Sequence, residues 1–242
     1  MNIKLEFIGR NHVTADIWQL HFKKPRGFIF TAGQYLEVTV DDPNPDERGN
    51  QRWFTISASP TQADIIITTR LVEQHSEFKD DLFGLKPGDT LDAKGPMGDF
   101  VLPAKSANIL WIAGGIGVTP FISQLQNLFD SKEHNRNIVL LHGVRSLNEE
   151  PAAGLIKQCE AVMPHLKVVQ VLSESKPPNW QGHTGYITAP LIQKAVPDYI
   201  ERQLFVSGPE PMVDSMKEIL LKINVPEKNI HQDWFPGYKE KY

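Results

Sequence analysis

The sequence predicts two domains, an N-terminal antiparallel Greek-key β-barrel over residues 1–103 and an α/β domain with a parallel sheet over residues 104–242. Short strands with alternating polar and apolar side chains, separated by turn residues, dominate the first part. Apolar strands alternate with helical patterns in the second part, which is typical of a parallel sheet. A short polar link at residues 103–107 separates the two patterns, and 242 residues are enough for two such domains.

The predicted barrel has six short strands and one helix. Its strands are expected at residues 3–7, 17–22, 35–40, 53–57, 65–69 and 90–94. Near-regular spacing of short strands indicates a small barrel rather than an open sheet. The helix is expected over residues 76–85, because Ser76 is a good N-cap. Lys79 and the two aspartates that follow it are expected to form a solvated face of this helix.

The predicted α/β domain has four parallel strands joined by helices. The strands are expected at residues 108–113, 137–141, 167–172 and 203–206. Helical spacing of apolar residues is found near 120–130, 149–162, 187–195 and 210–222. Because crossovers between parallel strands are right-handed, the loops after the strands should gather at one edge of the sheet, where open sheets bind ligands.

A glycine turn follows the first of these parallel strands. Gly114, Gly115 and Gly117 fall within four positions, and Thr119 and Pro120 are good N-cap and first-turn residues for the next helix. Strand, glycine turn and helix N-terminus together direct backbone N–H groups at an anion, typically a phosphate. The spacing differs from G-x-G-x-x-G, because Pro120 takes the third glycine position. A tight structural turn without a ligand is the alternative.

Further loops are expected at the same sheet edge. They contribute Arg145 after the second strand, Ser173 after the third, and Ser207, Gly208 and Pro209 after the last. Such side chains would meet the ribose and phosphate of a nucleotide. A basic cluster favours a 2′-phosphate and an acid favours a ribose diol, but Glu174 and Lys176 stand together in the third loop. The choice between NADH and NADPH therefore stays open.

The barrel has a candidate anion site of its own at Arg52-Trp53-Phe54-Thr55. An arginine on this strand can hold a phosphate through its guanidinium fork. Phe54 offers a flat face, and Thr55 offers a hydroxyl. An ordinary strand with a surface arginine is the alternative.

Composition excludes several classes of function. A net charge of −4 gives no reason to expect a nucleic acid or a membrane surface as partner. The single cysteine, Cys159, cannot form a disulfide framework or a cysteine-ligated cluster within the chain and favours a reducing compartment, so we expect a cytoplasmic monomer. The histidines show no H-x-x-H or H-E-x-x-H pair, and no metal is expected.

The order of the motifs, more than any one of them, resembles the ferredoxin–NADP⁺ reductase superfamily. The motifs are Arg52–Thr55, Gly95–Phe100, Gly114–Pro120 and Ser207–Met212, and the resemblance covers essentially the whole chain. It implies that the barrel binds FAD and that the α/β domain binds NAD(P)H.

The resemblance also implies roles for individual residues. Thr55, near the flavin N5, and Ser207, at the position of the family's cysteine beside the nicotinamide, would be the catalytic residues. Phe54 replaces the family's tyrosine and keeps a ring face for the flavin. The remaining cofactor-binding residues in the barrel would be Arg52 and Ser76 at the pyrophosphate, with Trp53, Arg70, Leu71 and Val72 around the flavin. Those in the α/β domain would be Gly114, Gly115, Gly117, Thr119, Arg145, Ser173, Gly208 and Pro209.

Aromatic residues near the C-terminus complete the implied site. Family members often cover the flavin with such a residue, and Trp234, Phe235, Tyr238 and Tyr242 are the candidates. Packing of Trp234 and Phe235 between the domains is the alternative.

The expected function is an FAD-dependent oxidoreductase that takes hydride from NAD(P)H. It would pass electrons to a separate acceptor such as a ferredoxin, a flavodoxin or an oxygenase component, since one cysteine cannot build a two-iron ferredoxin module. Two alternatives remain open. One is a flavin reductase that releases reduced free flavin. The other is a non-catalytic redox-sensing subunit, which Ser207 and Phe54 keep under consideration.

Overall fold

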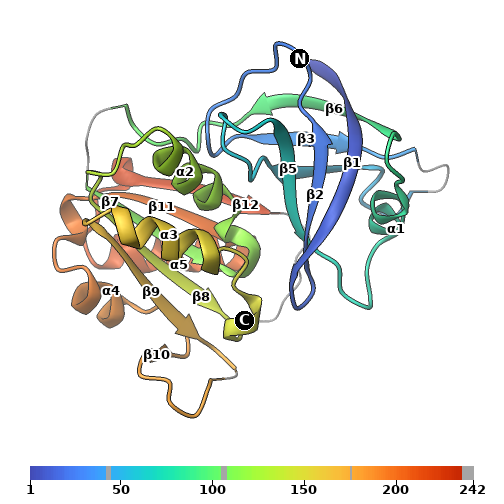
Figure 1. Ribbon diagram of the computed structural model, residues 1–242. Coiled ribbons are helices and arrows are strands. Elements are labelled where there is room, and N and C mark those ends of the chain that lie inside the picture. Colours follow the sequence, from blue (N-terminus) through green and yellow to red (C-terminus); the bar gives the residue numbers. More distant parts are fainter. Residues whose placement is uncertain (42–44, 105–107, 175, 236–242) are drawn as a thin grey trace.

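The computed structural model describes residues 1–41, 45–104, 108–174 and 176–235. Two six-stranded sheets lie side by side (Figure 1), the first built from β1–β6 and the second from β7–β12. The predicted domain boundary between residues 103 and 104 falls in the segment that joins them. No helix in the described part of the chain is both long and apolar enough to cross a membrane.

The first sheet is antiparallel and curved like a barrel. Its strands are β1 (Asn2–Thr14), β2 (Ile17–Lys23), β3 (Tyr35–Thr39), β4 (Gln51–Thr55), β5 (Asp64–Arg70) and β6 (Thr90–Met97), in the order β4-β3-β6-β1-β2-β5. After the edge strand β5, the chain crosses β2 and β1, and β6 pairs with both β1 and β3, as in a Greek key. Among the described residues no ladder joins β4 to β5, so the barrel is open at this seam. The predicted fold class of this half is confirmed.

Alternating side chains build the barrel core. Leu5 on β1, Leu20 on β2 and Leu36 on β3 are fully buried, which contributes about 1.5–3 kcal/mol for each. The helix α1 (Glu77–Gly84) packs Phe78 and Leu82 against this core. Ser76 takes the predicted N-cap position.

The second sheet is parallel throughout. Its strands are β7 (Ile109–Gly114), β8 (Ile138–Val144), β9 (Leu166–Leu172), β10 (His183–Thr184), β11 (Gln203–Pro209) and β12 (Ile230–Phe235), in the order β10-β9-β8-β7-β11-β12. The four predicted strands are present, and β10 and β12 were not predicted. Residues 230–235, for which no strand is predicted, form the edge strand β12 beside β11.

Helices cover both faces of this sheet. α2 (Thr119–Asp130) and α3 (Ala153–Val162) pack on one face with Trp111, while α4 (Ala189–Ala195) and α5 (Glu210–Lys222) pack on the other with Leu110 and Ile112. Neighbouring residues of β7 therefore face opposite helix layers, which explains its continuous apolar run. Short 3₁₀ turns are η1 (Gly115–Val118), η2 (Leu147–Glu149), η3 (Tyr199–Glu201) and η4 (Glu227–Asn229).

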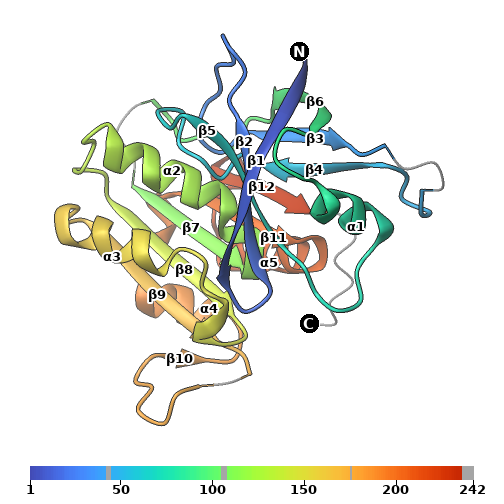
Figure 2. The same ribbon diagram turned by 45° about the vertical axis from the view of Figure 1, so that its right-hand side comes forward.

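Buried contacts hold the barrel against α2. Ser123 Oγ donates to the Ala58 carbonyl at 2.6 Å, and Gln124 Nε2 donates to the Phe100 carbonyl at 2.9 Å. The Phe100 ring lies against Phe121, at 5.7 Å between centroids. Both ribbon views show β12 directed toward the barrel (Figure 1, Figure 2). The carboxyl ends of the central parallel strands therefore meet the barrel.

Candidate active site between the two sheets

The glycine turn and the Ser207–Pro209 segment lie against each other, as the topology predicted. A Cβ on Gly117 would lie 2.4 Å from the Ser207 carbonyl oxygen and 2.5 Å from Gly208 Cα, so only glycine fits there. Gly115 has a φ of +52°, a left-handed conformation that favours glycine. Gly114 and Gly208 also approach closely, since a Cβ on Gly208 would lie 3.4 Å from Gly114 Cα.

Thr119 is not the N-cap of α2. The 3₁₀ turn η1 runs directly into the helix, so Val118 takes the cap position in a helical conformation and Thr119 is the first residue of α2. Thr119 is buried beside the turn. The predicted cap was wrong by one residue, because the glycine turn already begins to wind before Thr119.

Two buried hydroxyls have no partner. Within the described chain, four buried side-chain N or O atoms lack a hydrogen bond, and they belong to Thr55, Trp111, Gln124 and Ser207. Leaving such a group unsatisfied costs about 1–3 kcal/mol, and a common explanation is a missing ligand or water. Thr55 and Ser207 are the two residues that the sequence analysis assigned to catalysis. Their hydroxyls can therefore accept or donate hydrogen bonds to a bound group.

Each of these two hydroxyls has a titratable residue beside it on the neighbouring strand. Tyr35 lies opposite Thr55 on the barrel, and Asp233 lies opposite Ser207 on β12. Burial and then the charge of Asp233 raise the pKa of Tyr35. Burial, followed by the charge of Asp99, raises the pKa of Asp233 to about 7. Titratable groups of both sheets are thus gathered where the unpartnered hydroxyls lie.

Asp233 is a functional candidate that sequence reasoning missed. No strand is predicted over residues 230–235, so the sequence alone gives the Asp233 carboxylate no neighbouring strand. If the segment had been paired with the last predicted strand, Asp233 would have fallen beside Ser207.

Arg52 is held by its own loop. Its Nη2 lies 2.8 Å from both carboxylate oxygens of Asp46, and its Nη1 donates to backbone carbonyls, including Gly49 O at 2.6 Å. The guanidinium also lies over the Phe78 ring, 4.9 Å from its centroid. The fork that was expected to hold a phosphate is therefore already paired with a carboxylate.

Lys79 faces the barrel and not the solvent, so the expected solvated face was wrong for this residue. Its Nζ hydrogen-bonds Thr69 Oγ1 and lies 5.1 Å from the centroid of the Phe54 ring. Burial, together with the charges of Arg48 and Arg52, lowers the pKa of Lys79 to about 7. Arg48 and Arg52 thus act on both Lys79 and Asp46, and three cations with one aspartate leave positive charge that a phosphate dianion would neutralise.

Phe54 and Trp53 lie on opposite faces of β4, because side chains alternate along a strand. Phe54 is buried and stacks on Phe78, with ring centroids 5.9 Å apart. Trp53 is 45% exposed and donates from Nε1 to Glu37 at 3.0 Å. Trp53 therefore stays outside the group formed by Phe54 and Lys79.

Arg70 joins the two sheets instead of presenting its guanidinium to a flavin. Its Nε lies 3.0 Å from Asp16 on the barrel, and its Nη2 lies 2.7 Å from Glu149 in η2. Glu149 also accepts from Arg145 Nε at 3.0 Å. Leu71, whose N–H donates to the Asp16 carbonyl, is half-buried, and the Val72 that follows is 43% exposed.

Backbone hydrogen bonds join the segments that follow β8 and β9. Ser173 N–H donates to the Val144 carbonyl at 3.0 Å, and Glu174 N–H donates to the Arg145 carbonyl at 3.1 Å. The structure thus brings Arg145, Ser173 and Glu174 to one sheet edge, as predicted.

Trp234 and Phe235 belong to β12, where they lie opposite Gly208 and Pro209. The Trp234 side chain is 43% exposed. Tyr238 and Tyr242 lie outside the described residues.

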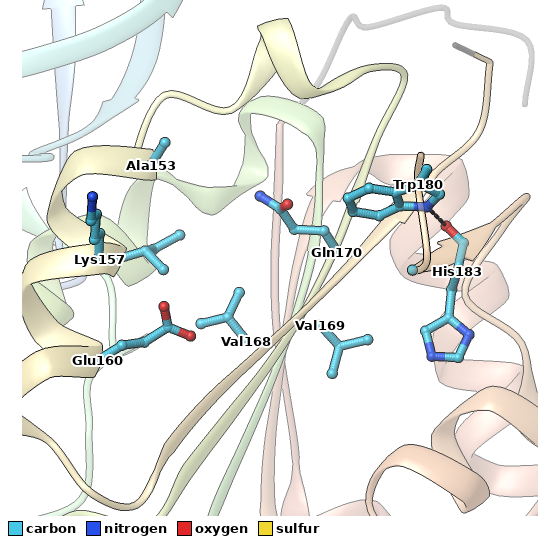
Figure 3. A pocket seen from close by; sticks show the side chains of 10 residues that line it. Ala153, Lys157, Glu160, Val168, Val169, Gln170, Trp180 and His183 are labelled. Atoms are coloured by element: carbon cyan, nitrogen blue, oxygen red, sulfur yellow. Dashed lines mark hydrogen bonds between the residues drawn. The ribbon is translucent and has the colours of Figure 1, made fainter. Parts of the chain in front are cut away.

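A cavity of about 500 Å³ lies elsewhere, between α3, β9 and the loop that carries Trp180 (Figure 3). Lys157 and Glu160 from α3 stand across from Trp180, with Gln170 between them. None of the predicted site residues lines it. In the described part of the chain, no group of three or more His, Cys, Asp or Glu residues could hold a metal ion.

Comparisons with known proteins agree with this geometry. Residues 111–218 match the oxidoreductase NAD-binding domain family. The phenol hydroxylase P5 protein of Acinetobacter pittii is 32% identical over 231 residues, which cover 92% of this chain and 62% of that protein. The chain therefore spans about three fifths of that relative's length.

Two solved structures share the fold over nearly the whole chain. The cytochrome P450 reductase GcoB of Amycolatopsis superposes with a TM-score of 0.83 at 23% identity, covering 97% of this chain and 70% of that one. The ferredoxin–NADP⁺ reductase of Plasmodium falciparum superposes with a TM-score of 0.77 at 17% identity, covering 97% and 96%.

Proposed function

We propose that this chain is a member of the ferredoxin–NADP⁺ reductase superfamily, an FAD-dependent oxidoreductase that takes hydride from NAD(P)H and passes electrons to a separate acceptor. One observation carries the proposal. Thr55 and Ser207 come from different sheets and each has an unpartnered buried hydroxyl, and their strand neighbours, Tyr35 and Asp233, interact electrostatically across the two sheets. A ligand that spans the two sheets would satisfy both.

The barrel would hold the FAD. Lys79 and the N-terminal turn of α1 that begins after Ser76 fit the pyrophosphate, since burial, together with the charges of Arg48 and Arg52, lowers the pKa of Lys79 and a phosphate would compensate this buried charge. Arg52 would contribute once it shares its guanidinium between Asp46 and the phosphate. Phe54 and Thr55 would position the ring system. FAD supplies chemistry that links two-electron hydride transfer to one-electron release.

The turn Gly114–Gly117 would hold the nucleotide, and Ser207 would orient its nicotinamide. Asp233, beside Ser207, can carry or release a proton on its carboxylate near neutral pH, because its pKa is about 7. Arg145, Ser173 and Glu174 would meet the ribose end. Trp234 would cover the flavin edge.

The acceptor we favour is an oxygenase component. Two of the relatives support this choice. One is a phenol hydroxylase protein and the other is a cytochrome P450 reductase, and both names refer to oxygenase systems. We propose a monomer, and a location in the cytoplasm, because the single cysteine is buried and unbridged, as is common in a reducing compartment.

A flavin reductase is the second candidate, and the pairing of Arg52 with Asp46 favours it. If Arg52 stays with Asp46, pyrophosphate binding is weaker and flavin is held as a substrate that leaves.

FAD retention distinguishes the two candidates. The protein is passed through gel filtration in FAD-free buffer, and its absorbance spectrum is recorded. Close to one FAD per chain supports the electron-transfer reductase. A colourless protein that oxidises NAD(P)H only when free flavin is added would support the flavin reductase. A protein that neither retains FAD nor oxidises NAD(P)H when free flavin is added would refute the proposed function.

A further inference from the structure

A buried ion pair lies directly beneath the glycine turn, and the proposed function gives it no role. His142 on β8 is fully buried, and the Glu150 side chain is 1% exposed. In register, His142 stands between Ala113 on β7 and Gln170 on β9. The ring is therefore enclosed by the strands that carry the turn.

Both ring nitrogens of His142 face acceptors. Nδ1 lies 2.6 Å from Glu150 Oε2, and Nε2 lies 2.9 Å from the carbonyl oxygen of Gly115. Glu150 also accepts hydrogen bonds from the Ala152 N–H at 2.9 Å and from Gln170 Nε2 at 3.2 Å. The Gly115 carbonyl can only accept, so Nε2 of His142 carries a hydrogen. Two other donors already point at Glu150, so we assign it as an ionised carboxylate, which makes Nδ1 a donor as well and the ring an imidazolium.

The electrostatics agree with this assignment. Burial alone would lower the pKa of His142, but the charge and hydrogen bond of Glu150 and the bond to Gly115 raise it. The pKa of Glu150 is lowered, since the effect of burial is outweighed by His142 and by its other donors. Each partner stabilises the charged form of the other.

The bond to Gly115 fixes the direction of a peptide plane. Gly115 has a φ of +52°, and among the described residues a Cβ there would meet no atom within 4 Å, so one side of the residue is open. In a trans peptide the C=O and the following N–H point in opposite directions. While His142 holds the Gly115 carbonyl, the Ile116 N–H points away from His142. The turn itself follows the carboxyl end of β7, where open parallel sheets bind ligands.

We infer that His142 is a positioning residue for the nucleotide, because its imidazolium, anchored by Glu150, holds the Gly115 carbonyl and presents the Ile116 N–H to the phosphate. A charged donor makes this bond stronger than a neutral one. Gln170, which also lines the cavity of Figure 3, donates its hydrogen bond to Glu150 from the neighbouring strand β9. The inference rests on the proposed function, because the nucleotide belongs to that site.

The test compares His142→Leu with Leu141→Ala. Leu141 is the preceding residue, fully buried on the opposite face of β8, so its truncation loosens packing without touching the turn. FAD content, affinity for NAD⁺ and NADP⁺ by calorimetry, and amide hydrogen exchange over residues 114–119 are measured for both variants and for the wild type.

For His142→Leu we expect nucleotide affinity to fall about tenfold, FAD content to stay unchanged and exchange at residues 115–118 to speed up. Leu141→Ala should leave affinity and turn exchange near wild type. Unchanged turn exchange in His142→Leu, or an equal increase in both variants, would overturn the inference. The exchange measurement needs no cofactor, so it tests the contact between His142 and the turn even if the wild type binds neither flavin nor nucleotide. A wild type that binds neither would refute only the proposed function.

A second measurement covers the case in which His142→Leu does not fold. A long-range ¹H–¹⁵N spectrum of the wild-type imidazoles at pH 7 should show His142 protonated on both nitrogens, and Glu150→Gln should convert it to a neutral ring. A neutral His142 in the wild type contradicts the inference.

Discussion

Replacing Lys79 with methionine should remove a pH dependence from FAD binding. The pKa of Lys79 is lowered to about 7 by burial and by Arg48 and Arg52. A pyrophosphate beside the ammonium would favour its charged form and raise that pKa again. Between about pH 7 and the ordinary pKa of 10.5, FAD binding would therefore take up one proton. Well above pH 7 each pH unit weakens binding about tenfold, or about 1.36 kcal/mol. Because Lys79 is about half protonated at pH 7, affinity at pH 9 is about fiftyfold lower than at pH 7.

The same group affects stability without FAD in the opposite sense. Because the folded-state pKa of Lys79 is depressed, the unfolded chain binds more protons between about pH 7 and 10.5, and stability rises with pH across that window. Below pH 7 the buried charge costs at most about 5 kcal/mol, which corresponds to a fall in pKa from 10.5 to about 7. Lys79→Met should therefore stabilise the FAD-free protein at pH 6 while weakening FAD binding there.

The assay is quenching of FAD fluorescence by FAD-free protein at several pH values from 6 to 9, together with thermal unfolding at pH 6. Lys94→Met is the matched control, since Lys94 is an exposed lysine on β6 and should leave both measurements unchanged. The reasoning is refuted if wild-type affinity is independent of pH, or if Lys79→Met keeps the wild-type slope.

Three further predictions concern the α/β side of the site. Asp233→Asn should abolish an inflection near pH 7 in the rate of flavin reduction by NAD(P)H, measured by anaerobic stopped flow; an inflection that persists would assign it to another group. Gly117→Ala should lower the melting temperature and weaken nucleotide binding, because its Cβ would lie 2.4 Å from the Ser207 carbonyl oxygen. The control Gly154→Ala, in an open position of α3, should raise the melting temperature. Equal effects of the two substitutions would argue against the close approach at Gly117. Glu174→Arg should shift the ratio of kcat/KM toward NADPH, and an unchanged ratio would remove this residue from the ribose site.

The parts of the site that could be predicted from the sequence depend on local pattern and topology. Gly117 and Ser207 were expected to meet because the loops after parallel strands gather at one sheet edge, and the structure places them in contact. Thr55 followed from its motif, and its unpartnered hydroxyl agrees with a ligand-binding role.

Other features depend on pairings between residues far apart in the sequence. Arg70 and Glu149 are 79 positions apart, so no spacing rule could join them. The strand β12 was missed because polar residues interrupt its apolar pattern, and Asp233 was missed with it. Lys79 was misplaced because a short helix beside charged residues does not indicate which side faces the core.

The measurement that tests the central claim most directly is anaerobic addition of NADH, and separately NADPH, to the FAD-loaded protein while its visible absorbance is recorded. If Thr55 and Ser207 mark the place where flavin and nicotinamide meet, at least one nucleotide should bleach the flavin, and Thr55→Val should slow the bleaching without loss of FAD. A yellow protein that neither nucleotide bleaches would contradict the account and favour a redox-sensing subunit.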